Sequence, residues 1–61
     1  MPAEPVFEVT VDKAGKYRFR LKASNGQIIA TSEAYESKDS CMNGIESVKK
    51  NAPKASVKEI Q

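Results

Sequence analysis

The sequence contains no histidine and no tryptophan, and it has a single cysteine, Cys41, in 61 residues. One cysteine cannot form a disulfide within the chain, and structural zinc sites are built mainly from cysteine and histidine ligands. Without histidine, none of the serines has the usual partner that would activate it as a nucleophile. These absences exclude the common covalent and metal supports of very small domains. They also predict a protein that is not an enzyme and carries no cofactor.

Long apolar runs are absent too. No stretch approaches the roughly 18 apolar residues that suggest a membrane span, and the start, MPAEPVFEV, lacks the basic and apolar regions of a signal peptide. A lone thiol suits a reducing compartment. We therefore expect a cytoplasmic protein with no membrane contact. Ten Lys and Arg against eight Asp and Glu give a net charge of +2, which is too small for a nucleic-acid-binding arm.

The short chain limits how much core it can bury. Below roughly 70–80 residues, a single core rarely supplies more than about 3–5 kcal/mol. With disulfide and zinc excluded, self-association is the support that we expect, and idealised packing in a monomer is the alternative. We predict a short tail over residues 1–5 and one domain over residues 6–61.

Two strands are predicted from the strict alternation of apolar and polar residues over 7–11 (FEVTV) and 17–22 (YRFRLK). The Asn25-Gly26 pair that follows is typical of a two-residue type I′ hairpin loop. Such a loop predicts a third strand over residues 28–32, with Ala23 opposite Ile28 and Leu21 opposite Ala30, and it gives Ile28 a place on the core face. Alternation in this register directs the basic side chains of the second strand to one face of the sheet.

Acidic residues are expected beside that basic face. The register places Glu8 opposite Arg20 and Glu33 opposite Arg18, so both carboxylates flank the cations. A slip of one residue would bury charge, and the register is therefore well specified.

A helix is predicted after Ser37, which is a favourable N-cap residue. Apolar residues at helical spacing form one face; they are Cys41, Ile45, Val48 and Ala52. Gly44 borders this face, and close packing on the sheet is the expected reason for it. Residues 55–60 are predicted as a short final strand. Val57 and Ile60 would point to opposite faces of it, so either both sides of this strand are covered or its end meets another chain.

The motifs GKYRFRLKASNGQIIATSEAY, then SK, then CMNGIESVKKNAP closely resemble the YegP-like family of small uncharacterised bacterial proteins over about residues 7–58. The resemblance implies an α+β fold, a β-β-β-α-β unit whose antiparallel sheet carries one helix on one face. It also implies tandem or paired units that exchange the C-terminal strand, and so a homodimer here. It transfers no established activity, ligand or catalytic residue.

Three groups of candidate site residues follow. Anion binding is assigned to Lys16, Arg18, Arg20 and Lys22, although charged residues on a sheet surface more often serve solubility. Dimer contacts are assigned to Ile29, Met42, Val57 and Ile60, although isolated exposed apolar residues are common. A redox role is considered for Cys41, against the simpler interpretation that it packs in the core.

We expect a non-enzymatic homodimeric interaction module with an unidentified protein partner. Two alternatives are a weak nucleic-acid or anion binder that uses the basic face and a thiol-based stress sensor that uses Cys41. Tyr35 is the one aromatic residue that we expect to be free, and this is too few for the base stacking that the first alternative needs.

Overall fold

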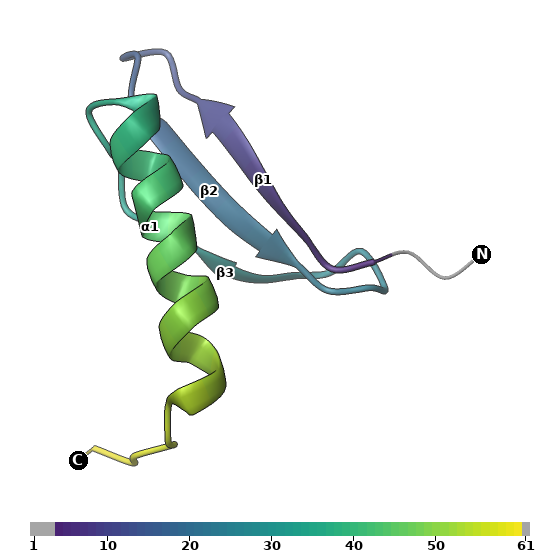
Figure 1. Ribbon diagram of the computed structural model, residues 1–61. Coiled ribbons are helices and arrows are strands. Elements are labelled where there is room, and N and C mark those ends of the chain that lie inside the picture. Colours follow the sequence, from purple (N-terminus) through teal and green to yellow (C-terminus); the bar gives the residue numbers. More distant parts are fainter. Residues whose placement is uncertain (1–3, 61) are drawn as a thin grey trace.

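Three antiparallel strands and one helix make up the fold of the computed structural model, which describes residues 4–60 (Figure 1). The elements in chain order are β1 (Val6–Val11), β2 (Tyr17–Lys22), β3 (Ile28–Thr31), α1 (Lys38–Asn51) and a 3-10 turn (Ala52–Lys54). The strands lie in the order β1-β2-β3, and α1 packs on one face of the sheet. Residues 1–3 of the predicted tail and Gln61 of the predicted domain lie outside the described residues.

The pairing of β1 with β2 confirms the predicted register. Val11 lies opposite Tyr17 and Glu8 opposite Arg20. The connecting turn is held by Asp12, whose carboxylate accepts hydrogen bonds from the backbone N–H groups of Ala14 and Lys16. Gly15 completes it at φ +81°, a conformation that other residues adopt at a steric cost.

The loop between β2 and β3 differs from the prediction. Ala23 N–H donates to the Gln27 carbonyl at 2.8 Å, so three residues, and not two, form the loop. Gly26 has a positive φ of +85°, whereas Asn25 does not, and a type I′ loop needs both. The arrangement is that of a three-residue hairpin loop with a left-handed glycine at its third position. The type I′ assignment is therefore wrong.

A β-bulge restores the predicted register further along the hairpin. Lys22 pairs with Ile28, but the next residue, Leu21, pairs with Ala30, so β3 contains one extra residue, Ile29. The predicted pairing of Leu21 with Ala30 is confirmed, and that of Ala23 with Ile28 is wrong. Because Ile28 lies opposite Lys22, it leaves the predicted core face and is 48% exposed.

Beyond Thr31 the chain stays beside β2 for one more residue, because Ser32 N–H donates a hydrogen bond to the Phe19 carbonyl at 2.9 Å. Ser32 Oγ accepts a hydrogen bond from Phe19 N–H at 2.9 Å, in the place of a backbone carbonyl. The backbones of Tyr17 and Tyr35 then exchange two hydrogen bonds of 2.8 and 2.7 Å. The Tyr17–Tyr35 pair is shifted by one residue relative to the contact between Phe19 and Ser32, so the regular pairing ends before Glu33. Its predicted position opposite Arg18 is therefore not found.

The helix begins where predicted. Ser37 Oγ caps it by accepting a hydrogen bond from Ser40 N–H at 3.1 Å. The buried core consists of Phe19 from β2 with Cys41 and Ile45 from α1. The half-buried residues that pack against this core are Phe7, Tyr17, Tyr35 and Val48.

Gly44 allows α1 to lie close to two aromatic rings, as expected. A Cβ atom at this position would come within 2.9 Å of Tyr35 Cζ and 3.2 Å of Phe19 Cε2. Tyr35 itself is stacked on Phe19, with ring centroids 6.2 Å apart and an interplanar angle of 17°. The helix, the connector and the sheet therefore meet at this glycine.

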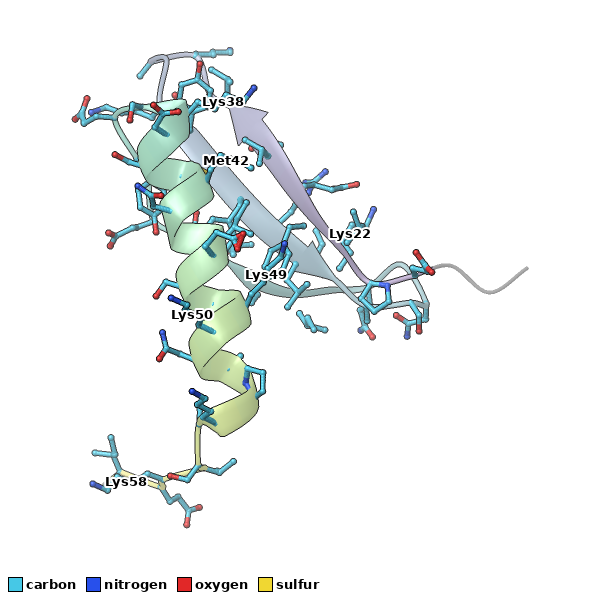
Figure 2. All side chains as sticks on the ribbon, viewed as in Figure 1. Lys22, Lys38, Met42, Lys49, Lys50 and Lys58 are labelled. Atoms are coloured by element: carbon cyan, nitrogen blue, oxygen red, sulfur yellow. The ribbon has the colours of Figure 1, made fainter. Side chains whose placement is uncertain are left out.

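The predicted final strand is not present in the described chain. Residues 55–60 form no helix or strand and continue beyond the end of α1, away from the sheet (Figure 1). Lys58 in this segment lies far from Lys22 on the sheet (Figure 2). A strand over residues 55–60 would be apolar on both sides, and no surface of the rest of the described chain lies where it could cover such a strand. The fold of the described residues is therefore β-β-β-α.

Replacing Gly44 by alanine tests this packing. A glycine-to-alanine change inside a helix normally stabilises it by about 1 kcal/mol, but overpacking costs about 1–3 kcal/mol. We expect Gly44→Ala to lower the free energy of unfolding by about 1 kcal/mol in urea denaturation. The exposed neighbour provides the control, because Asn43→Ala raises helix propensity without a clash. A Gly44→Ala protein as stable as Asn43→Ala would contradict the packing.

Candidate functional site

One face of the sheet, opposite α1, carries alternating charged and hydroxyl side chains. We call it the charged face and define it by six residues: Glu8, Thr10, Arg18, Arg20, Lys22 and Thr31. β1 and β2 place these side chains together because their register sets Thr10 opposite Arg18 and Glu8 opposite Arg20. Thr31 of β3 lies opposite Arg20 on the other side. The structure therefore gathers three of the four predicted anion-binding cations on one surface.

Each of these cations has a carboxylate partner. Glu8 Oε1 accepts a hydrogen bond from Arg20 Nε at 2.7 Å, and Glu8 Oε2 lies 3.6 Å from Lys22 Nζ. Asp12 Oδ2 lies 3.7 Å from Arg18 Nε, too far for a hydrogen bond. Arg18 and Lys22 are therefore both paired less tightly than Arg20.

Lys16, the fourth predicted cation, has its partner elsewhere. Its ammonium group forms an ion pair with Glu36, in the connector before α1. This pair lies beside the backbone bridge between Tyr17 and Tyr35. Lys16 therefore helps to hold the connector against the start of β2 and is separate from the Arg18–Arg20 group.

These contacts lower the pKa values of the two acidic partners, Glu8 and Asp12. The hydrogen bond from Arg20 holds the pKa of Glu8 below its usual value, and the charges of Lys22 and Arg20 act in the same direction. The pKa of Asp12 is lowered chiefly by the hydrogen bond from Lys16 N–H, with a further contribution from the N–H of Ala14 and the charge of Arg18. Both carboxylates are thus ionised at neutral pH, and they partly neutralise the face.

A hollow of about 240 Å³ lies on the charged face between the two arginines. Its lining consists of Thr10, Arg18, Phe19, Arg20, Thr31 and Ser32. The Phe19 ring is buried on the opposite face, so the backbone of this residue forms the floor. No carboxylate lines the hollow.

The four predicted dimer contacts are all exposed. The exposed fractions are 60% for Ile29, 43% for Met42, 101% for Val57 and 85% for Ile60. Two valines of β1 that share the Phe7 side of the sheet, Val9 and Val11, are also exposed, at 37% and 58%. The apolar surface around α1 is therefore larger than the sequence pattern indicated.

Cys41 has no exposed surface. Its relative exposure is 0%, and it packs with Phe19 and Ile45 in the core. A redox sensor needs an accessible thiolate, so a redox role for Cys41 would require local opening of the helix–sheet contact.

Sequence reasoning did not identify two features of the face. Asp12 was interpreted as a turn residue only, but it also lies near Arg18. The hydroxyl residues Thr10 and Thr31 carried no signal apart from their register positions, since threonine is common in strands.

Residues 4–60 contain no group of three or more Cys, Asp or Glu side chains that could hold a metal ion. Within the same range, no helix is long and apolar enough to cross a membrane.

The lowered pKa values predict a specific acid response. A lowered folded-state pKa stabilises the protein above the unfolded value, and that stability is lost as the pH falls through the folded value. We expect the free energy of unfolding to decrease below about pH 4.5, the ordinary pKa of a glutamate side chain. Glu8→Gln should be less stable than the wild type at pH 7, and the two should converge in acid.

Urea denaturation between pH 7 and pH 2 measures this difference. Glu59→Gln serves as the control, because Glu59 lies in segment 55–60 and makes no ion pair with any described residue. If Glu8→Gln and Glu59→Gln follow the same stability curve, the carboxylate of Glu8 does not stabilise the fold.

Burial of Cys41 predicts slow alkylation in the native protein. Exposing the thiol requires opening of the core, which costs about 3 kcal/mol or more in a domain of this size. We expect iodoacetamide to modify the native thiol about a hundredfold or more slowly than the denatured one. Mass spectrometry measures the rate of this reaction. Fast modification of the thiol in the native protein would favour the redox hypothesis.

Comparison with known proteins confirms the resemblance to the YegP-like family. The model of the "Domain of unknown function (DUF1508)" family matches residues 12–59. A UPF0339 protein of Treponema denticola is 63% identical over 54 residues, which are 88% of this chain and 93% of that protein. The UPF0339 protein YegP of Yersinia pestis is 51% identical over 55 residues, which are 90% of this chain but 49% of YegP.

A solved structure shows the same fold. The solution NMR structure of a protein from Haloferax volcanii has a TM-score of 0.84 and 52% identity, covering 95% of this chain and 98% of that chain. Because archaeal proteins are among these relatives, the predicted restriction to bacteria is not supported. With a family model over residues 12–59 and a relative that is 63% identical, this chain belongs to the DUF1508 family of uncharacterised proteins, which includes YegP.

Proposed function

We propose that this protein is a non-enzymatic, cytoplasmic interaction module that works as a homodimer, in which each chain donates its C-terminal segment to the other. The observation that carries the proposal is the exposure of residues 55–60. Val57 is 101% exposed and Ile60 is 85% exposed, in a segment without regular structure. When a second surface covers apolar side chains that are exposed in this way, the free energy of the system decreases.

The body of the domain offers a surface that this segment can cover. Three residues form the buried core, and Val9, Val11 and Met42 remain partly exposed around it. β1 and β3 are the edges of the described sheet, and an extended segment from another chain can add to such an edge through main-chain hydrogen bonds. Reciprocal exchange between two copies would cover both segments in a closed, two-fold assembly.

The lengths of relatives support a paired unit. The Treponema denticola relative is nearly the same length as the matched region, whereas the matched region spans only 49% of YegP. The longer relatives thus have room for a second unit in the same chain. Two units, joined covalently in some members and non-covalently here, account for both lengths.

Analytical ultracentrifugation of the full chain tests the assembly. We expect the wild type to sediment with twice its 6.7 kDa chain mass at micromolar concentration. Val57→Asp should weaken the dimer by about a hundredfold or more, since burying a valine side chain is worth about 1.5–3 kcal/mol and is lost twice in a symmetric pair.

The neighbouring position supplies a matched control. Ser56→Asp adds the same charge to the same exposed segment without removing an apolar side chain, and it should leave the dimer intact. A wild-type chain that sediments as a monomer at micromolar concentration would reject the proposal. So would an equal effect of the two substitutions, because the apolar side chain would then have no part in assembly.

A further inference from the structure

The hollow on the charged face is lined by hydrogen-bond donors that the fold leaves unused. Arg18 and Arg20 each have five N–H donors, and among the described residues only Arg20 Nε donates to a side chain. The terminal amino groups of both guanidinium groups make no hydrogen bond with residues 4–60. Two residues that line the hollow therefore carry donors that no described residue satisfies.

Two threonine hydroxyls complete the set. Thr10 lies opposite Arg18 on β1, and Thr31 lies opposite Arg20 on β3. The Ser32 hydroxyl, in contrast, is already occupied, since it accepts from Phe19 N–H and donates to the Glu33 carbonyl. Four donor groups from three strands therefore surround one space.

We infer that this hollow binds a phosphate dianion, either as inorganic phosphate or as the monoester group of a small metabolite. Guanidinium groups match the geometry of phosphate oxygens, and charge-assisted hydrogen bonds are about twice as strong as neutral ones. Residues two apart on a strand lie roughly 6.6–6.8 Å apart on the same face, so two arginines can contact opposite sides of one tetrahedral anion.

Charge selects a dianion over a monoanion. Glu8 already holds Arg20 at 2.7 Å, so a ligand must compete with a carboxylate for this guanidinium group. Arg18, whose nearest carboxylate oxygen is 3.7 Å away, is the accessible entry point. A ligand with two negative charges gains attraction from both arginines and from Lys22, which offsets the repulsion by Glu8 and Asp12.

The same face disfavours a single-stranded nucleic acid. Strands of nucleic acid bind to sheets through aromatic side chains that stack on the bases. The four aromatic residues pack in or against the core, and they are Phe7, Tyr17, Phe19 and Tyr35. An internal phosphodiester also carries only one negative charge.

An NMR titration tests the inference on the full chain. Inorganic phosphate is added at pH 7.5 and constant ionic strength, with chloride replaced by phosphate, and the amide signals are followed. We expect saturable shifts at Thr10, Arg18–Arg20 and Thr31. A nucleoside monophosphate should give the same shifts, and an oligonucleotide without a terminal phosphate should give none.

Substitutions then distinguish a specific phosphate site from a general effect of positive charge. Arg18→Gln, which leaves the Glu8–Arg20 pair intact, should weaken phosphate binding about tenfold or more, the loss of one charged hydrogen-bond partner. Thr10→Val should weaken it severalfold at unchanged charge. Lys54→Gln removes one positive charge outside the sheet and should have no effect.

Three results would overturn the inference. These are shifts that do not saturate, equal weakening by Arg18→Gln and Lys54→Gln, and tighter binding of the oligonucleotide than of phosphate. The proposed dimer stands or fails separately, because the hollow contains none of residues 55–60 and sedimentation does not report on it.

Discussion

The stack of Tyr35 on Phe19, closed by Gly44, is the contact on which the arrangement of the described residues depends. Tyr35 belongs to neither the sheet nor the helix, yet its backbone pairs with Tyr17 and its ring lies between β2 and α1. The connector is therefore held both by its backbone and by the Tyr35 ring before Ser37 caps the helix. With only three buried residues between positions 4 and 60, this part of the chain has few other contacts that could set the position of α1 on the sheet.

In the hairpin of β2 and β3, the loop length and the apolar pattern of the strands favour different registers. A three-residue loop shifts the pairing by one position relative to a type I′ loop, which would turn the Leu21 side of β2 away from its partners on β3. The bulge at Ile29 absorbs this shift, so that Leu21 still lies opposite Ala30. The apolar pattern, which carries the burial free energy, thus determines the register, and the loop adapts to it.

Strands, helix and cap could be predicted because each depends on local periodicity or on one residue with a specific role. The Glu8–Arg20 pair followed from the register alone. The three-residue loop could not be distinguished from a two-residue one, since Asn-Gly suits both. Asparagine and glycine both take a positive φ in a type I′ loop, whereas only Gly26 does so in the loop found here. Tyr35 was missed because its role arises from a break in β3 that no periodic pattern encodes. The hollow was missed for the same reason, as its lining includes Thr31 and Ser32 at that break.

The two faces of the sheet present opposite physical situations. On the charged face, carboxylates satisfy part of the positive charge and leave guanidinium and hydroxyl donors available around a hollow. On the helix face, three buried side chains are surrounded by apolar groups that water still reaches. Covering the second face lowers the free energy of the fold itself, whereas filling the first satisfies donors that are already solvated. The proposed association through the helix face would therefore raise the stability of the fold, whereas the inferred binding at the charged face would depend on the concentration of the ligand.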